Sequence, residues 1–287
     1  RMTSLIDDKV VVVTGAGNGI GREEALYFAK NGARVVVNDM GGPRDGSGNN
    51  KAVAEAVVEE IKALGGQAVA SPHSVADLDG AESVIWTALN RFKRVDVLVN
   101  NAGILRDRSL LNMTESEWDA VINVHLKGTF LMTRAFGRAL KMQASGGAIV
   151  NTSSLSGLLG NFGQANYSAA KAGIYGITLT ASMELAKIGC RVNAIAPVAL
   201  TRMTEDVPML QDMGVNEMGP QYIAPVVAWL ASSLSEGITG RVFGVHGPKV
   251  FEYSMEQNAG MEKPPQGDAW TPEALQANIA TIAFRER

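Results

Sequence analysis

Short apolar runs alternate with longer amphipathic stretches along most of the chain. Residues 9–14 read Lys-Val-Val-Val-Val-Thr, a β-branched run typical of a strand buried on both faces of a parallel sheet. Comparable runs predict further strands at 33–38, 68–71, 95–99, 148–151, 191–195 and 242–245. Helical patterns lie between or after them at 22–31, 53–64, 81–92, 118–140, 167–187, 222–232 and 272–284. This alternation predicts a single α/β domain with a doubly wound parallel sheet of about seven strands.

A glycine-rich turn directly follows the first expected strand. Gly15, Gly19 and Gly21 separate that strand from the helical pattern at 22–31. Glycines in this position let the backbone approach a pyrophosphate, and the helix N-terminus favours its charge. The spacing is G-x-x-x-G-x-G and not the commoner G-x-G-x-x-G. The context predicts a dinucleotide site in a Rossmann-type sheet.

Asp39 ends the second expected strand, eighteen residues after Gly21. A carboxylate at this spacing accepts hydrogen bonds from an adenosine ribose and repels a 2′-phosphate, so we expect NAD rather than NADP. Arg44, in the next loop, is a cation that could weaken that preference. The polar, glycine-rich loop at 41–50 is either a flexible solvent loop or a border of the adenosine, and both interpretations stay open.

Three residues suggest proton transfer to or from an alcohol oxygen. Tyr167 and Lys171 are four apart in a helical pattern and therefore share a face. Ser154 follows the expected strand at 148–151, a usual place for an active-site hydroxyl. A nearby cation lowers the pKa of tyrosine from its ordinary value of about 10. Such a pair alone is more often structural, and the other motifs favour the catalytic interpretation. Asn123, a weak helix former, could bend its helix or hold a water.

The composition limits the partners. The chain has 287 residues, a formal net charge of −3 and no long basic run, which argues against nucleic acid or an anionic membrane. No apolar stretch reaches the roughly 18 residues of a membrane helix. Cys190 is the single cysteine and no secretory signal is recognisable, so we expect a cytoplasmic protein. We expect no metal site.

Taken together, the motifs resemble the classical branch of the short-chain dehydrogenase/reductase family. They are found at 14–21, 100–103, 123, 154, 167–171 and 197. Residues 38–42, 73–75, 103–109 and 160–167 are similar, more narrowly, to the (3R)-hydroxyacyl-CoA dehydrogenase units of that family. The resemblance implies a stand-alone dehydrogenase domain at 7–250, an extension at 251–287 that packs on the domain or on a partner subunit, and a homodimer or homotetramer.

The resemblance also implies roles for single residues. Tyr167 is the acid/base, Lys171 lowers its pKa and holds the nicotinamide ribose, Ser154 positions the substrate oxygen, and Asn123 holds a water that links Lys171 to solvent. The implied cofactor contacts are Gly15, Asn18, Gly19, Ile20, Asp39, Ser74, Val75, Asn101, Ala102, Gly103, Tyr167, Lys171, Pro197, Val198 and Thr201. Two features depart from the family. Pro197-Val198 replaces the frequent Pro-Gly, which leaves Thr201 as the nearest candidate to contact the nicotinamide amide. His246-Gly247-Pro248 replaces a usual glycine pair near the end of the domain.

The implied activity is NAD-dependent oxidation of a (3R)-hydroxyacyl-CoA to the 3-ketoacyl-CoA, in fatty-acid or steroid side-chain β-oxidation. Three alternatives remain: a 17β-type dehydrogenase acting on free steroid, an NADPH-dependent 3-ketoacyl reductase, which Asp39 argues against, and a non-catalytic NAD-sensing protein, which the complete catalytic set argues against. The methionine-rich segment at 201–219 predicts either an adaptable lid over an apolar substrate or core filling. Arg106 and Arg108 either meet CoA phosphates or, as we expect, form surface pairs with Asp107.

Overall fold

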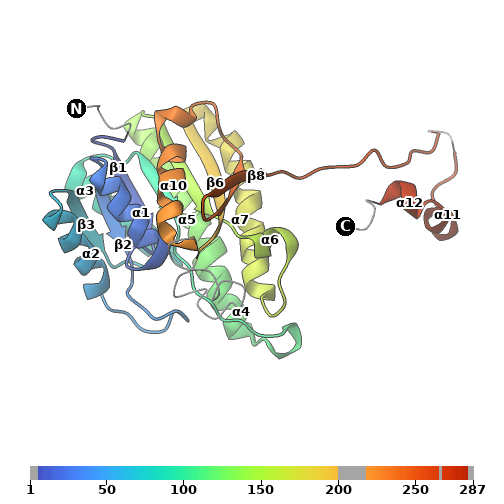
Figure 1. Cartoon of the computed structure of the whole chain (residues 1–287), viewed down its shortest axis with the longest axis horizontal. Coiled ribbons are helices and arrows are strands. Elements are labelled where there is room, and N and C mark those ends of the chain that lie inside the picture. The colour runs from blue at the N-terminus through green and yellow to red at the C-terminus, as the bar shows by residue number, and fades with distance from the viewer. Residues whose placement is uncertain (1–5, 200–217, 265–266, 284–287) are drawn as a thin grey trace. The chain divides into compact units, whose positions relative to one another are not determined.

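An eight-stranded sheet forms the centre of the first unit of the chain, residues 1–253 (Figure 1). The structure is a computed structural model that describes residues 6–199, 218–264 and 267–283. The strand order is β3-β2-β1-β4-β5-β6-β7-β8, and β8 alone in this sheet runs antiparallel, against β7. The strands are β1 Val10–Thr14, β2 Arg34–Asn38, β3 Gln67–Ser71, β4 Val97–Asn100, β5 Gly147–Thr152, β6 Cys190–Val198, β7 Val242–His246 and β8 Lys249–Tyr253. The seven expected strands are confirmed, and β8 is an addition that the sequence analysis missed.

Helices cover both faces of the sheet. One face, on which α1 and α10 are labelled in Figure 1, packs against three helices. They are α1 Gly19–Lys30, α2 Ala52–Ala63 and α10 Ala224–Ala231. The opposite face is covered by α3 Leu78–Phe92, α5 Gly128–Gln143 and α7 Ala165–Glu184. Val11 and Val13 of β1 pack into the first apolar layer, while Val10 and Val12 pack into the second. Successive strand residues face opposite sides, so the continuous valine run supplies both layers.

The helical segment before β5 contains a π-helical turn. Its three pieces are α4 Glu115–Ile122, a π-helical turn at Asn123–Lys127, and α5. In the turn the Gly128 N–H donates to the Asn123 carbonyl, five residues back. A capping box formed by Thr114 and Glu117 starts α4 at Glu115, before the expected position 118. The long helical segment expected at 118–140 is confirmed, and a π-helical turn begins in it at the weak helix former Asn123.

The strand order indicates which edge of the sheet would bind a ligand. The chain leaves β1 toward β2 on one side and returns to its other side with β4. In open α/β sheets, ligands bind outside the carboxyl ends of the strands at such a reversal. Both the glycine turn after β1 and the Asn101–Gly103 turn after β4 lie there.

The chain divides into two units, residues 1–253 and 254–287. Residues 251–253, expected in the extension, belong to β8 and pair with β7. In the second unit the Thr271 side chain accepts from the Ala274 N–H and caps α11 Pro272–Ala277. The helix ends there, and α12 Ile279–Ile282 follows, where we expected one helix to about 284. At the break the Asn278 side chain donates to the Ala274 carbonyl, a local bond that competes with regular helix. Within the described residues, none of the helices is long and apolar enough to cross a membrane.

Candidate active site

The turns after β1 and β4 are bonded to each other. The Thr14 hydroxyl accepts from the backbone N–H groups of Asn101 and Ala102, each at 3.1 Å. The Asn101 amide donates to the Thr14 and Gly15 carbonyls at 3.0 and 3.1 Å. Gly15 has φ +65°, and a Cβ there would lie 2.7 Å from the Ala102 Cα. Only glycine allows this close approach of the two turns.

The N-terminus of α1 is suited to an anion. Its N-cap residue Asn18 makes no side-chain capping bond, and its first turn contains no acidic residue. The unpaired N–H groups and the helix dipole both favour a negative group. The residues present therefore fit the pyrophosphate of a dinucleotide.

Asp39 is held rigidly after β2. One of its carboxylate oxygens accepts from the Gly17 N–H at 2.8 Å, and the other accepts from the Gly41 N–H at 2.6 Å. Each oxygen has a further lone pair for a ribose hydroxyl. The negative charge is therefore fixed at the position where the sequence analysis expected it.

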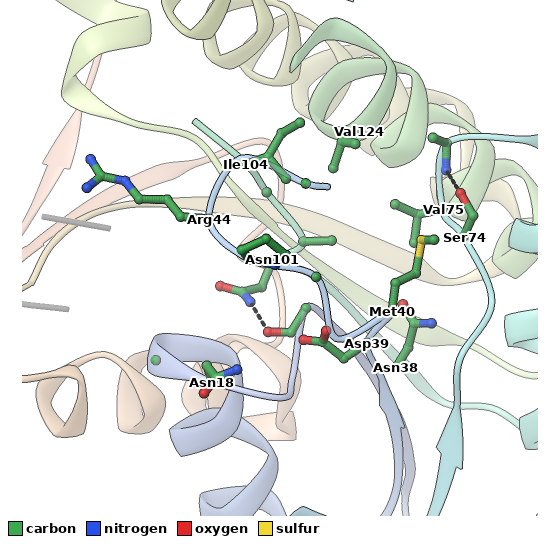
Figure 2. A pocket seen from close by; sticks show the side chains of 18 of the residues that line it. Asn18, Asn38, Asp39, Met40, Arg44, Ser74, Val75, Asn101, Ile104 and Val124 are labelled. Atoms are coloured by element: carbon green, nitrogen blue, oxygen red, sulfur yellow. Dashed lines mark hydrogen bonds between the residues drawn. The ribbon is translucent and has the colours of Figure 1, made fainter. Parts of the chain in front are cut away.

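A pocket lies at this edge (Figure 2), and the labelled side chains of Asp39, Asn101 and Ile104 surround it. Ten of the expected cofactor contacts line it: Gly15, Asn18, Gly19, Ile20, Asp39, Ser74, Val75, Asn101, Ala102 and Gly103. Ile104 and Val124 also line it, although neither was found from the sequence. Pro197 and Val198 end β6 outside this lining. Thr201 lies outside the described residues, as does the methionine-rich segment except for its last two positions.

The glycine-rich loop at 41–50 borders the pocket. Gly42, Pro43, Arg44, Gly46 and Gly48 all belong to the lining. The loop is bonded to the segment after β4: the Leu105 N–H donates to the Arg44 carbonyl at 3.0 Å, and Arg106 Nε donates to the Asp45 carbonyl at 2.9 Å. Of the two interpretations left open, the structure supports the border of the pocket.

Ser154, Tyr167 and Lys171 are brought together beyond β5. Ser154 caps the short helix α6 Leu155–Leu159, and Tyr167 and Lys171 lie in the first turns of α7. Lys171 Nζ is 5.5 Å from the centre of the Tyr167 ring and donates to the Thr152 carbonyl at 2.6 Å. The π-helical turn that begins at Asn123 packs against α7. None of these four lines the described pocket, but the His125 ring packs both on Tyr167 and against Gly103 of the pocket wall, so Tyr167 lies beside the pocket.

Burial determines the resting charges of this group. It raises the pKa of Tyr167 to about 12, while a hydrogen bond from Ser154 acts in the opposite direction. Burial also lowers the pKa of Lys171 to about 7. Both shifts favour neutral side chains, because a buried charge loses its hydration. The expected lowering of the Tyr167 pKa by Lys171 is opposed by burial and stays a prediction.

The surface arginines near the site have other partners than expected. Arg108 Nε lies 3.2 Å from a Glu117 carboxylate oxygen, and Arg106 donates to the Asp45 carbonyl. Asp107 instead accepts from the Gln164 amide at 2.8 Å. The expected pairing with Asp107 is therefore corrected.

Comparison with known proteins agrees with this geometry. A family model described as short chain dehydrogenase matches residues 9–210. The chain is similar to peroxisomal multifunctional enzyme type 2 of Drosophila melanogaster, with 52% identity over 230 residues that make up 80% of this chain and 38% of that protein. It is also similar to a hydroxyacyl-CoA dehydrogenase of Mycobacterium tuberculosis, with 41% identity over 295 residues and coverage of 96% of this chain and 89% of that one.

The solved structure of a short chain dehydrogenase from Mycobacterium avium superposes with a TM-score of 0.85 at 46% identity, covering 97% of this chain and 95% of that one. The chain spans between 29% and 38% of the length of several multifunctional peroxisomal relatives.

Proposed function

This chain belongs to the short-chain dehydrogenase family, and we propose on that premise that it oxidises a (3R)-hydroxyacyl-CoA to the 3-ketoacyl-CoA with NAD. The family makes it an oxidoreductase that acts on CH–OH groups with a nicotinamide dinucleotide. The observation that carries the proposal is the grouping of Ser154, Tyr167 and Lys171 beside a pocket that fits a dinucleotide. The acyl-CoA substrate is supported by the names of the relatives.

The preference for NAD is supported by Asp39. Its carboxylate is fixed by the N–H groups of Gly17 and Gly41 and cannot swing away from a 2′-phosphate without losing both bonds. A fixed negative charge close to a phosphate is repulsive in a partly desolvated pocket. Arg44 lines the same pocket, so the preference is expected to be strong but finite.

The chain's own residues would handle the proton. Ser154 donates a hydrogen bond that holds the substrate oxygen, and Tyr167 accepts the hydroxyl proton as the C–H bond breaks and the carbonyl forms. When bound, the oxidised nicotinamide supplies the hydride acceptor and a positive charge. When Lys171 is protonated, its ammonium favours the Tyr167 phenolate, against the burial that favours the neutral phenol. General base help of this kind is worth about 10²–10⁴-fold in rate.

Proton exchange with solvent is proposed to run from Lys171 toward Asn123. Lys171 is almost fully buried, and the turn that carries Asn123 packs on its helix. A water held by the Asn123 amide would complete the route.

Assembly as a homodimer or homotetramer stays a prediction. The cytoplasmic location also stays a prediction, and the peroxisomal names of several relatives weigh against it.

The test is NADH formation with a panel of substrates. We expect turnover of (3R)-hydroxyacyl-CoAs, with a dependence on acyl length that identifies the natural chain. Turnover of free steroid alcohols without turnover of any thioester would overturn the acyl-CoA assignment. Tight NAD binding without turnover of either class would overturn the enzyme assignment and favour a cofactor-sensing role.

A further inference from the structure

His125 fills the space between the cofactor pocket and the catalytic tyrosine. It lies in the π-helical turn before α5, and its side chain is 2% exposed. The imidazole stands edge-on to the Tyr167 ring, with 5.3 Å between ring centres and 88° between ring planes. On its other side a Cβ on Gly103 would overlap the imidazole Cε1. One ring therefore packs directly on Tyr167 and on the turn after β4.

The same imidazole is bonded to the wall of the pocket. Its Nε2 lies 3.0 Å from the Ile104 N–H and 2.8 Å from the Ile104 carbonyl oxygen. Whichever ring nitrogen carries the proton, Nε2 makes one of these bonds. Gly103 and Ile104 both line the pocket. A shift of His125 would move both the cofactor wall and the ring of Tyr167.

Simple core filling does not account for this residue. An apolar ring would fill the volume without a polar atom, whereas Nδ1 of His125 is buried and has no partner among the described residues. Such unsatisfied groups are uncommon in native interiors and call for an explanation. The π-helical turn is a second irregularity, and turns of this kind occur frequently at functional sites. It places His125 against α7 while Asn123 stays in the same turn.

The charge state of His125 suits a fixed spacer. Burial, together with the nearby Lys171, lowers its pKa to about 3, and the bond to Ile104 opposes this only in part. The imidazole is therefore neutral at working pH. It adds no second cation beside Lys171, and its bond to Ile104 does not change with pH in the neutral range.

We propose that His125 is a positioning residue that sets the separation between the Tyr167 hydroxyl and the cofactor wall at Gly103–Ile104. This inference rests on the proposed function, because Tyr167 has to act on an alcohol held against the cofactor. Misplacing reacting groups by about 1 Å can cost about 10²-fold in rate. The residue acts through Tyr167 and Ile104 and does not itself touch the substrate.

Two substitutions separate its two contacts. His125→Phe keeps a ring of similar size against Tyr167 and removes the bond to Ile104. His125→Gln keeps a polar group that reaches toward Ile104 and removes the ring. We expect His125→Phe to raise both the Kd and the KM for NAD about tenfold with a small change in kcat, and His125→Gln to lower kcat about tenfold or more with the Kd for NAD nearly unchanged.

The measurements are NAD affinity by calorimetry without substrate, steady-state kinetics on any alcohol that the wild-type protein oxidises, and thermal unfolding. Met132→Leu, fully buried in α5 and part of the core, is the matched control for a buried change. A weaker NAD affinity with little change in kcat in His125→Phe, together with a lower kcat at nearly unchanged NAD affinity in His125→Gln, would support the proposal. Equal losses in both, or losses that follow Tm as in Met132→Leu, would refute it. The NAD affinity is measured without substrate, and the kinetics use whichever alcohol the wild-type protein oxidises. The test of His125 therefore does not depend on whether that alcohol is an acyl-CoA.

Discussion

Replacing Glu24 by glutamine should stabilise the protein above neutral pH and change it little in acid. Glu24 lies in α1, is fully buried, and has both carboxylate oxygens without a partner among the described residues. Burial raises its pKa from an ordinary value of 4.5 to about 8. An unpaired buried carboxylate is costly, so the folded protein keeps the proton.

The sign and size of the effect follow from proton linkage. Well below about pH 4.5 both the folded and the unfolded chains hold the proton, and Glu24 adds no pH dependence to the stability. As the pH rises toward about 8 the unfolded chain loses its proton while the folded chain keeps it, so stability falls. The loss attributable to Glu24 is about 3 kcal/mol between about pH 5.5 and pH 8. The Glu24→Gln variant has a side chain of the same size that cannot ionise, so it escapes this loss.

Urea unfolding followed by tryptophan fluorescence at several pH values would measure the difference between variant and wild type. Glu55→Gln is the matched control, because it makes the same substitution at an exposed position on α2. The reasoning is refuted if the stability difference between Glu24→Gln and wild type is the same at about pH 5.5 and pH 8.

Three further predictions concern the reaction. Tyr167→Phe should lower kcat at least about 10²-fold while calorimetry finds NAD binding nearly intact, and retained turnover would remove Tyr167 from the mechanism. Because burial raises the pKa of Tyr167 to about 12 and oxidation needs the phenolate, kcat/KM for oxidation should rise with pH and that for ketone reduction should fall; parallel profiles would contradict this assignment. Asp39→Asn should raise the ratio of kcat/KM for NADP to that for NAD about tenfold or more by removing a charge, and an unchanged ratio would show that Asp39 does not select the cofactor.

The strands were predictable where one residue pattern has one interpretation. The valine run of β1 is apolar at every position because both faces are covered, and such a run suits a buried parallel strand. β8 reads Lys-Val-Phe-Glu-Tyr, a mixed edge strand without a strong signal. The sequence analysis therefore assigns residues 251–253 to the tail, although the backbone of β8 pairs with β7.

The placement of the glycine turn and Asp39 at one edge was predictable because these residues are close together in the sequence. The glycine turn and Asp39 follow consecutive strands, and the strand order alone brings them to one edge. The loop at 41–50 was ambiguous because glycine-rich polar loops are either free or bound. Its bonds to Leu105 and Arg106 join residues about sixty positions apart, and no local pattern marks them.

The catalytic end was predictable in residue type but not in environment. A spacing of four places Lys171 near Tyr167, and the structure confirms their proximity. The sequence analysis expects the Lys171 charge to lower the pKa of Tyr167. In the folded chain, burial dominates the pKa values of both Tyr167 and Lys171. The role of His125 could not be read from its helix, because it depends on contacts with Ile104 and Tyr167 that only the folded chain makes.

The most direct test of the central claim is the ratio of kcat/KM for the (3R)- and (3S)-enantiomers of one hydroxyacyl-CoA with NAD, measured by NADH formation. The Tyr167→Phe variant serves as the blank. The proposed function predicts turnover of the (3R)-enantiomer, little or no turnover of the (3S)-enantiomer, and none in the blank. Preference for the (3S)-enantiomer, or equal turnover of both, would contradict it.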